Sequence, residues 1–257
     1  MNVVAIVSAK GGVGKTTVCA NLAVALARRE RQVLAIDLDP QNALRHHFGL
    51  DPSGLAGLSR ATLGESDLLS VCQPTESGVI VLPYGMVNET DRQIFETVLA
   101  KEPSWLSRHL AGLGLDDDAI IVLDTPPGPS IYLRQALTAA NLVVVITLAD
   151  AASYATLPMI EGLIETYCVG RPGFIDHAFL INQVNRSRQL AKDVVLSMQA
   201  SLGDRVVSLV HQDQAVGEAL AYNQSVLDYD PYCQGTSDFQ HTADWVLDSL
   251  RQLPPHP

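Results

Sequence analysis

The stretch Ala9-Lys10-Gly11-Gly12-Val13-Gly14-Lys15-Thr16-Thr17 decides the fold. It follows the apolar run Val3–Val7 and precedes a helical pattern over residues 15–30. A glycine-rich loop between a strand and a helix turns its backbone N–H groups toward the phosphates of a nucleotide, and the helix N-terminus adds a positive dipole end. The spacing predicts that Lys15 reaches the β- and γ-phosphates and that the Thr16 hydroxyl binds Mg²⁺. The sequence therefore predicts that residues 10–17 bind a nucleotide.

Two details of this loop depart from the generic phosphate-binding pattern. Ala9 stands where that pattern has glycine, and Lys10 is a second lysine that the pattern does not require. The stretch resembles the deviant form, K-G-G-x-G-K-T-T, of the MinD/ParA class of ATPases. The resemblance implies a slow ATP hydrolase in which Lys10 crosses a dimer interface to the partner's nucleotide and acts there like an arginine finger. The site of such a homodimer is complete only when two copies meet.

Length and composition narrow the class of protein. A chain of 257 residues can bury one large α/β core, and we expect a single domain over residues 1–253 with a disordered tail over 254–257. The net charge of −11 argues against a surface that holds nucleic-acid phosphates. The cysteines lie far apart, which predicts neither a disulfide framework nor a metal site. With no signal peptide and no membrane-spanning run, we expect a cytoplasmic protein.

Apolar, β-branched runs alternate with helical patterns along the chain. Continuous apolarity is typical of parallel strands that are buried on both faces, so we expect a doubly wound, mostly parallel sheet flanked by helices, with the ligand at the C-terminal ends of the strands. The predicted strands are Val3–Val7, Val33–Ile36, Val79–Leu82, Ala119–Leu123, Leu142–Leu148, Ala178–Ile181 and Val206–Val210. The predicted helices lie near 15–30, 41–48, 90–112, 130–140, 153–168, 187–202, 213–223 and 238–251, and residues 49–75 read as a loop with one or two short helices.

Carboxylates follow two of the predicted strands. Asp37 and Asp39 end the second strand in the stretch Ile36–Gln41, and Asp124 ends the run Ile120–Leu123. At the C-terminal edge of a parallel sheet such groups can address a metal–phosphate centre, and an aspartate after a hydrophobic strand is the Walker B arrangement that orders the water shell of Mg²⁺. A turn or cap role before residue 41 is the alternative for the first pair, since Asp-Pro favours turns.

The resemblance to the MinD/ParA class extends to these carboxylates. The D-x-D-P-Q stretch matches switch I, which implies that Asp37 holds Mg²⁺ through water and that Asp39 positions or activates the attacking water. The sequence D-T-P-P-G after Leu123 matches switch II, in which the region of Gly128 senses the γ-phosphate. The implied catalytic residues are Lys10, Lys15 and Asp39, and the implied metal ligands are Thr16, Asp37 and Asp124.

The stretch Leu180–Asn185 bears on the choice of base. Gln183 and Asn185 stand where the N-K-x-D stretch of a GTPase has lysine and aspartate, so ATP is favoured over GTP. In the MinD/ParA class an asparagine at the position of Asn182 contacts adenine, and an amide can pair with the donor and acceptor edge of that base. The alternative for Asn182 is a plain turn residue at a strand end.

The C-terminal third indicates a family within the class. Most relatives carry I-P-R-D after the penultimate strand, whereas this chain has His211 and Gln212 in place of proline and arginine, and both are candidate adenine contacts. The stretch Val210–Ala221, with the pattern x-Q-x-V-x-x-Y over Asn223–Tyr229, resembles the MinD-like ATPases of bacterial cellulose synthase operons, the BcsQ/YhjQ type. That resemblance implies an ATP-dependent dimer that localises or assembles a cellulose synthase complex at the inner membrane or cell pole.

Other members of the class remain as alternatives. A ParA-type partitioning ATPase is the runner-up, although it needs basic residues in its C-terminal half, where only Lys192, Arg205 and Arg251 follow Arg188. The last helix mixes apolar and acidic residues, so we expect no direct membrane anchor of the kind that ends MinD.

Amide-forming synthetases share the loop, and so do bacterial tyrosine kinases, whose tyrosines form a tail. Here we expect Tyr222, Tyr229 and Tyr232 to be core and loop residues. A nucleotide-locked scaffold with negligible turnover also stays open.

Overall fold

An eight-stranded sheet organises the computed structural model, which describes residues 1–64 and 66–252. The strand order is β3-β4-β2-β5-β1-β6-β7-β8, and β3 is the one described strand that pairs antiparallel. The prediction of a doubly wound, mostly parallel α/β fold is confirmed. The strands are β1 (Asn2–Val7), β2 (Val33–Asp37), β3 (Gln73–Pro74), β4 (Ile80–Leu82), β5 (Ile120–Asp124), β6 (Leu142–Leu148), β7 (Asp176–Val184) and β8 (Val206–His211).

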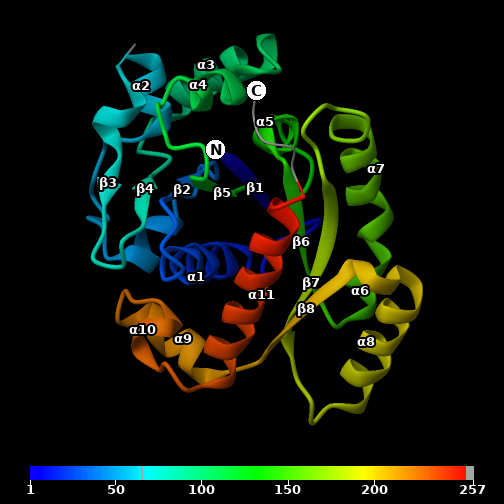
Figure 1. Cartoon of the computed structure of the whole chain (residues 1–257). Helices are drawn as coiled ribbons and strands as arrows, with labels where there is room; N and C mark the ends of the chain where they lie inside the picture. The colour runs from blue at the N-terminus through cyan, green and yellow to red at the C-terminus, as the bar shows by residue number, and fades with distance from the viewer. Residues whose placement is uncertain (65, 253–257) are drawn as a thin grey trace.

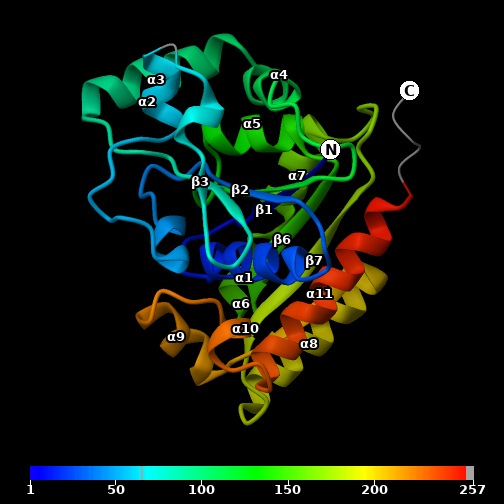
Figure 2. The same cartoon turned by 60° about the vertical axis from the view of Figure 1, so that its left-hand side comes forward.

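Helices cover both faces of the sheet (Figures 1 and 2). One face carries α2 (Leu58–Leu63), α3 (Glu89–Lys101), α4 (Trp105–Ala111), α5 (Ile131–Ala139), α7 (Leu157–Tyr167) and α8 (Gln189–Leu202). The other face carries α1 (Lys15–Ala27), α9 (Gln214–Ala221), α10 (Val226–Tyr229) and α11 (Gln234–Leu250). The short helix α6 (Ala151–Ala155) and the 3₁₀ helices η1 (Leu44–Phe48), η2 (Leu68–Val71) and η3 (Gly203–Arg205) lie in connections.

The sheet separates two hydrophobic clusters. Alternate residues of a strand point to opposite faces, so Ala5 and Val7 of β1 join one cluster while Val4 and Ile6 join the other. All of β5 is buried. This two-sided burial explains why the central strands are continuously apolar and why their carboxyl ends place the predicted site residues at one edge of the sheet.

The structure corrects several predicted boundaries. The helix expected over 90–112 is two helices, because Pro103 lies between α3 and α4, and a proline disfavours helical geometry in the residue before it. The helix expected over 153–168 divides at Thr156. The stretch 49–75 contains β3 in addition to two short helices, and the last helix begins at Gln234 instead of residue 238. The predicted tail over 254–257 lies outside the described residues.

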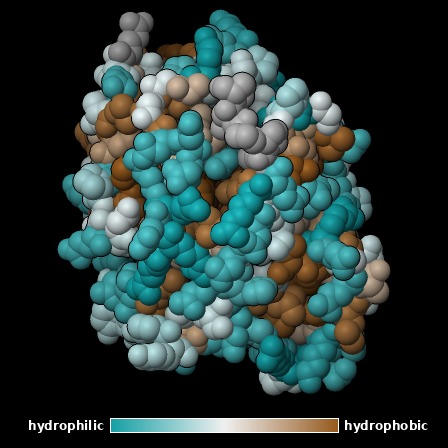
Figure 3. Space-filling model, viewed as in Figure 1, coloured by the Kyte–Doolittle hydropathy of each residue, from teal (hydrophilic) through white to brown (hydrophobic). Residues whose placement is uncertain are grey.

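The two edges of the sheet differ. The edge strand β3 has two residues, of which Pro74 lacks a backbone N–H. The opposite edge strand β8 has six residues and pairs with β7 alone in the part of the chain that the structure describes. Figure 3 shows apolar surface to the right of α11, over the region of β8 and α8. No helix of the described chain has the length and apolarity needed to cross a membrane.

Candidate nucleotide-binding site

The predicted phosphate loop lies between β1 and α1 as expected. Gly12 and Gly14 have φ angles of 77° and 83°, a left-handed region that glycine enters without strain. A Cβ atom at Gly14 would stand 2.5 Å from Nδ2 of Asn182, so this position also needs a small residue for lack of space. The helix begins at Lys15, directly after Gly14, and its first backbone N–H groups are therefore available to an anion.

Lys15 and Asp124 form a buried ion pair at the centre of the site. Nζ of Lys15 lies 3.0 Å from Oδ1 of Asp124, and the two side chains are 6% and 0% exposed. Burial raises the pKa of Asp124, although the Lys15 ammonium acts in the opposite direction. The second oxygen, Oδ2, is buried and has no hydrogen-bond partner among the described residues. A buried acceptor without a partner is costly, and here it sits where the Walker B pattern expects an ordered metal water.

Asp37 faces into the protein at the end of β2. Oδ1 accepts from the backbone N–H of Asp39 at 2.9 Å, and Oδ2 accepts from that of Leu44 at 3.0 Å. Burial, with a further contribution from the charge of Asp124, raises the pKa of Asp37 well above its usual range. The turn role that the sequence left open is therefore realised in the geometry. The role of Asp37 toward Mg²⁺ stays a prediction.

Asp39 is held in a different way. Its Oδ1 accepts from the backbone N–H of Gln41 at 2.9 Å, and the other oxygen has no hydrogen-bond partner among the described residues. The side chain is 8% exposed. Asn42, with a φ of 52°, fixes the following turn, because its side chain accepts from the N–H of Tyr84 and donates to the carbonyl of Gly85. Asp39 thus presents one free carboxylate oxygen from a rigid turn.

The D-T-P-P-G stretch packs on the phosphate loop. The N–H of Gly128 donates to the carbonyl of Ser8 at 2.9 Å, and Gly128 has a φ of 70°. A Cβ at Gly11 would lie 3.6 Å from Cγ of Pro127. The hydroxyl of Thr125 donates to the carbonyl of Ile6. The two loops that the sequence predicted to share a γ-phosphate are therefore in direct contact.

Lys10 is bound within its own chain. Its Nζ lies 3.5 Å from Oδ1 of Asp150 and 3.4 Å from Oγ of Ser153, and the side chain is 37% exposed. Asp150 also caps α6 by accepting from the N–H of Ser153. The predicted transfer of Lys10 to a partner's nucleotide requires the release of this contact.

The candidate adenine residues come from β7 and β8. Nδ2 of Asn182 donates to the carbonyl of Val13 at 2.8 Å, which places the amide against the phosphate loop. Nδ1 of His211 lies 2.9 Å from Oδ2 of Asp238 on α11, while its buried Nε2 has no partner in the described chain. Oε1 of Gln212 accepts from Nδ2 of Asn185 at 2.9 Å. The ends of both strands therefore lie together at the edge that carries the loop.

The residues present fit Mg²⁺ bound mainly through phosphate and water. The structure has no group of three or more His, Cys, Asp or Glu side chains arranged as a metal cage within its described residues. Mg²⁺ keeps several waters and takes one or two protein oxygens together with substrate phosphates. Thr16 and the unpartnered Oδ2 of Asp124 offer that kind of site, and Asp37 could reach it only by giving up its two backbone contacts.

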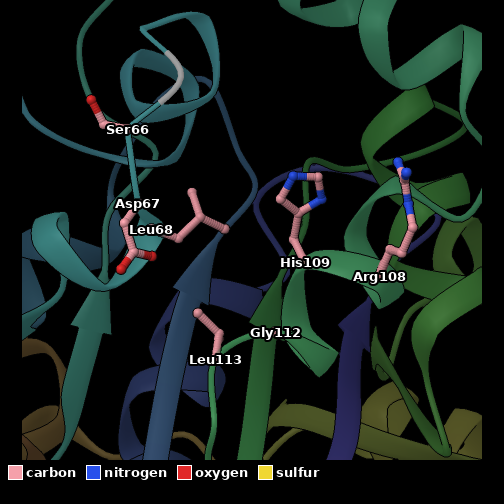
Figure 4. Close-up of a pocket in the computed structure, with 7 residues that line it drawn as sticks. All are labelled: Ser66, Asp67, Leu68, Arg108, His109, Gly112 and Leu113. Atoms are coloured by element: carbon pink, nitrogen blue, oxygen red, sulfur yellow. The ribbon is translucent and has the colours of Figure 1, made fainter.

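A separate pocket of about 340 Å³ lies between the segment 66–68 and α4, and it does not contain the predicted residues (Figure 4). The ring of His109 stacks on Trp105 with centroids 4.2 Å apart, and its Nδ1 contacts the carbonyl of the same residue. The pocket is lined by Ser66, Asp67, Leu68, Arg108, His109, Gly112 and Leu113. It is distinct from the candidate site.

Sequence reasoning missed three contacts of the site. Asp150 comes two residues after the end of β6, and Asp124 is the last residue of β5, so the pattern of a carboxylate at a strand end was available to find it. Asn42 gave a weaker signal, because asparagine tolerates left-handed geometry in turns. Asp238 gave none, because a single acidic residue on a mixed helix reads as a solvated position, whereas it is 8% exposed.

Comparison with known proteins agrees with this geometry. The family model described as "Cellulose biosynthesis protein BcsQ" matches residues 1–247. The chromosome-partitioning ATPase Soj of Thermus thermophilus is 29% identical over 256 residues, covering 97% of this chain and 96% of the relative. The cellulose biosynthesis protein BcsQ of Escherichia coli is 27% identical over 251 residues, covering 96% of this chain and 94% of the relative.

Solved structures share the fold. The septum site-determining protein MinD of Pyrococcus horikoshii, complexed with Mg-ADP, superposes with a TM-score of 0.76 at 23% identity and covers 95% of both chains. A cobyrinic acid a,c-diamide synthase of Mycobacterium smegmatis with bound ATP analogue and magnesium gives a TM-score of 0.79 at 22% identity, covering 100% of this chain and 98% of the other. At these identities the likeness concerns the fold.

The fold and the loop together define a P-loop protein of the MinD/ParA-like ATPase class. Within that class, the match over residues 1–247 shows that the chain belongs to the BcsQ family of cellulose biosynthesis proteins. The expected resemblance is confirmed.

Proposed function

We propose that this protein is an ATP-dependent dimerising switch, folded as one domain over residues 1–253, that hydrolyses ATP and localises or assembles a cellulose synthase complex at the cytosolic face of the inner membrane. The observation that carries the proposal is the buried Lys15–Asp124 pair with its unpartnered Oδ2, enclosed by the phosphate loop and the D-T-P-P-G stretch. Such an arrangement holds phosphate and a magnesium water shell without further ligands.

The residues of the phosphate loop and of the strand ends have separate roles in ATP binding and hydrolysis. The N–H groups of residues 11–17 and the Lys15 ammonium bind the phosphates, which requires Lys15 to turn from Asp124 toward the nucleotide. Mg²⁺, when bound, neutralises charge that develops on the phosphate oxygens. Thr16 and Asp124 would hold the metal and its water, and Asp37 keeps the turn that presents Asp39. The free oxygen of Asp39 orients the attacking water.

The base and the second copy complete the site. Asn182, His211 and Gln212 lie at the strand ends where adenine would stack, and the unpartnered Nε2 of His211 is available to its polar edge. Lys10 leaves Asp150 and stabilises the phosphate charge across a homodimer interface, as an arginine finger does. Hydrolysis is slow until this happens.

The BcsQ family supports the cellulose role, and the Soj relative supports the runner-up, a partitioning ATPase. A scaffold that binds ATP without turnover is the binding-module alternative. Steady-state phosphate release, measured with and without a candidate partner, separates the scaffold from an active switch.

The first test is ATP binding by a Lys15→Ala variant. We expect at least a hundredfold loss of ATP affinity in isothermal titration, because the ammonium contacts the phosphates directly. Lys192→Ala, an exposed lysine on α8, is the matched control and should bind like the wild type. Unchanged affinity in Lys15→Ala would show that the loop does not bind ATP.

The second test is the oligomeric state of Asp39→Ala with ATP and Mg²⁺. If Asp39 positions the water, this variant binds ATP without hydrolysing it and elutes as a persistent dimer in size exclusion. Adding Lys10→Ala to that variant should return the monomer. A monomer for Asp39→Ala itself at high protein concentration contradicts the switch.

A further inference from the structure

A second concave surface lies on the α1 side of the sheet. It is a pocket of about 580 Å³ bounded by the end of η1, the β3–β4 turn and the segment between α9 and α10. Figure 1 shows α9 and α10 at the lower left, below α1. We refer to it as the tyrosine pocket, after Tyr222 in its wall. Its polar lining includes His47, Glu76, Tyr222, Asn223 and Asp228. None of the predicted nucleotide-site residues lines it.

His47 is a buried polar group that opens on this pocket. The residue is 6% exposed, and neither ring nitrogen makes a hydrogen bond with a described residue. Burial, with a smaller contribution from His46, lowers the pKa of His47 to about 4. At neutral pH the ring is therefore uncharged and keeps one nitrogen as a hydrogen-bond acceptor. An acceptor without a described partner on the pocket wall is available to a donor that enters the pocket.

Tyr222 offers an open aromatic face. Its ring stacks on Tyr229 with centroids 5.5 Å apart and an interplanar angle of 19°, so one face is covered. The residue is nevertheless 66% exposed, and Tyr232 nearby in the chain is 97% exposed. Both residues lie in turns, in agreement with the expectation that these tyrosines are core and loop residues. A stacked tyrosine with a free face is a common platform for a cation.

The charge around the tyrosine pocket is negative. Arg28 is paired with Asp228, so this cation is already neutralised. Glu76 is exposed and has no ion-pair partner in the described chain. Glu218, which accepts from the Tyr229 hydroxyl at 3.0 Å, also has none there. A ligand that fits must bring positive charge and N–H donors.

We infer that the tyrosine pocket docks an arginine side chain from an extended segment of a partner protein. The planar guanidinium stacks on Tyr222, donates to the Glu76 carboxylate and to the neutral ring of His47, and leaves the Arg28–Asp228 pair in place. Arginine fits better than lysine because it presents several donors in a fixed plane and loses less hydration on stacking.

Both walls of the pocket are bonded to segments of the nucleotide site. Leu44, which begins η1, donates to Asp37, and Val226, which begins α10, donates to Oδ1 of Asn21 at 2.7 Å. Asn21 in turn donates to the carbonyl of Thr17 at 2.8 Å. The docking itself needs no nucleotide. The docking proposal can therefore be tested independently of the proposed ATPase activity.

The test uses the whole chain and fluorescein-labelled peptides of one length, Gly-Arg-Gly-Arg-Gly and its Lys and Glu counterparts, followed by fluorescence anisotropy. We expect the arginine peptide to bind more tightly than the lysine peptide and the glutamate peptide not to bind. Tyr222→Ala should weaken arginine-peptide binding about fivefold or more, and Tyr222→Phe should keep it within about twofold. Glu76→Gln should weaken it about threefold and reduce its salt dependence.

Glu165→Gln is the matched control, because Glu165 is an exposed acid on α7 at the opposite face of the sheet. Equal weakening by Glu165→Gln would show unspecific attraction to an acidic protein and overturn the proposal. Binding of the lysine or the glutamate peptide as tight as that of the arginine peptide would do the same. Self-association of the chain that Tyr222→Ala abolishes would assign the pocket to a second copy instead.

Discussion

At the scale of single residues, His47 shows how burial sets a charge state. Its pKa of about 4 lies below the value near 6.5 that a histidine has in an unfolded chain. Above pH 6.5 both states of the protein carry the neutral ring. Between pH 6.5 and 4, His47 is largely protonated in the unfolded chain and largely neutral in the folded chain. The free energy of unfolding therefore falls as the pH falls through this window.

The first prediction in this section follows from that window. Between pH 7.5 and 5.5, His47 should lower the free energy of unfolding by about 1.5 kcal/mol, from the difference between the two pKa values. Urea unfolding of the wild type and of His47→Gln at both pH values measures it, and the variant should lose less stability on acidification. An identical loss in both proteins would mean that His47 is protonated in the folded state.

Asp37 is a second residue whose setting decides its role. Both of its oxygens accept backbone N–H groups, so its carboxyl group already stabilises the turn before η1. A carboxylate held in this way positions Asp39 whether or not it also faces a metal water. In this geometry Asp37 fulfils the turn interpretation of the D-x-D-P-Q stretch, and the ligand interpretation requires it to give up these contacts.

At the scale of helices and strands, Gln135 joins three helices. From α5 it donates to the carbonyls of Leu99 and Glu102 at 2.9 and 2.7 Å, and it accepts from the N–H of Leu106 at 3.0 Å. The residue is 2% exposed. It thus satisfies the end of α3 and the start of α4 across the break at Pro103.

We expect Gln135→Leu to lower the free energy of unfolding by about 2–4 kcal/mol, because it strips buried backbone groups of their partners. Thr138→Ala, on the same helix, removes only a bond to the carbonyl of Arg134 and should cost well under about 1 kcal/mol. Urea denaturation gives both values. Hydrogen exchange at the Leu106 amide should accelerate in Gln135→Leu alone; equal protection in both variants would contradict the bridging role.

Much of the architecture was predictable, because the central strands are buried on both faces and their apolar runs are continuous. The same logic located Asp37 and Asp124 at strand ends. The break at Pro103 was readable in the sequence and was missed. The start of α11 was harder to find, because Cys233 is an unusual cap whose Sγ accepts from the N–H of Thr236 at 3.4 Å.

The partners of the site residues were not predictable. Lys10 meets Asp150, and His211 meets Asp238, across sequence separations of 140 and 27 residues. Such pairs depend on how β6 and α11 are placed by the fold as a whole. Local pattern contains no information on that placement, and so the roles of Lys10 and His211 could be proposed only from resemblance.

At the scale of the whole molecule, net charge bears on the choice between the two proposed functions, the cellulose role and DNA partitioning. The chain carries a net charge of −11, and of the late basic residues Arg205 is paired with Glu161 and Arg251 with Asp248. A surface of this kind repels phosphate backbones.

We therefore expect no ATP-dependent mobility shift of nonspecific duplex DNA at about 100 mM salt. The Asp39→Ala variant with ATP is the most demanding form of the assay, since it would hold any dimer together. A shift that depends on ATP and disappears in Lys15→Ala would instead favour the partitioning ATPase.

The unequal edges of the sheet set a limit on assembly. Near the isoelectric point of about 4.9 the repulsion between molecules vanishes. In the described chain β8 pairs with β7 alone, so its other edge offers backbone groups for pairing with another strand, except for the N–H of His211, which donates to Asp238. The opposite edge gives no such template, because β3 is two residues long and contains Pro74. A molecule with only one sheet edge that can pair with another strand cannot extend a fibril in both directions. Sheet-to-sheet polymerisation by this route ends at a pair joined through β8 about a two-fold axis.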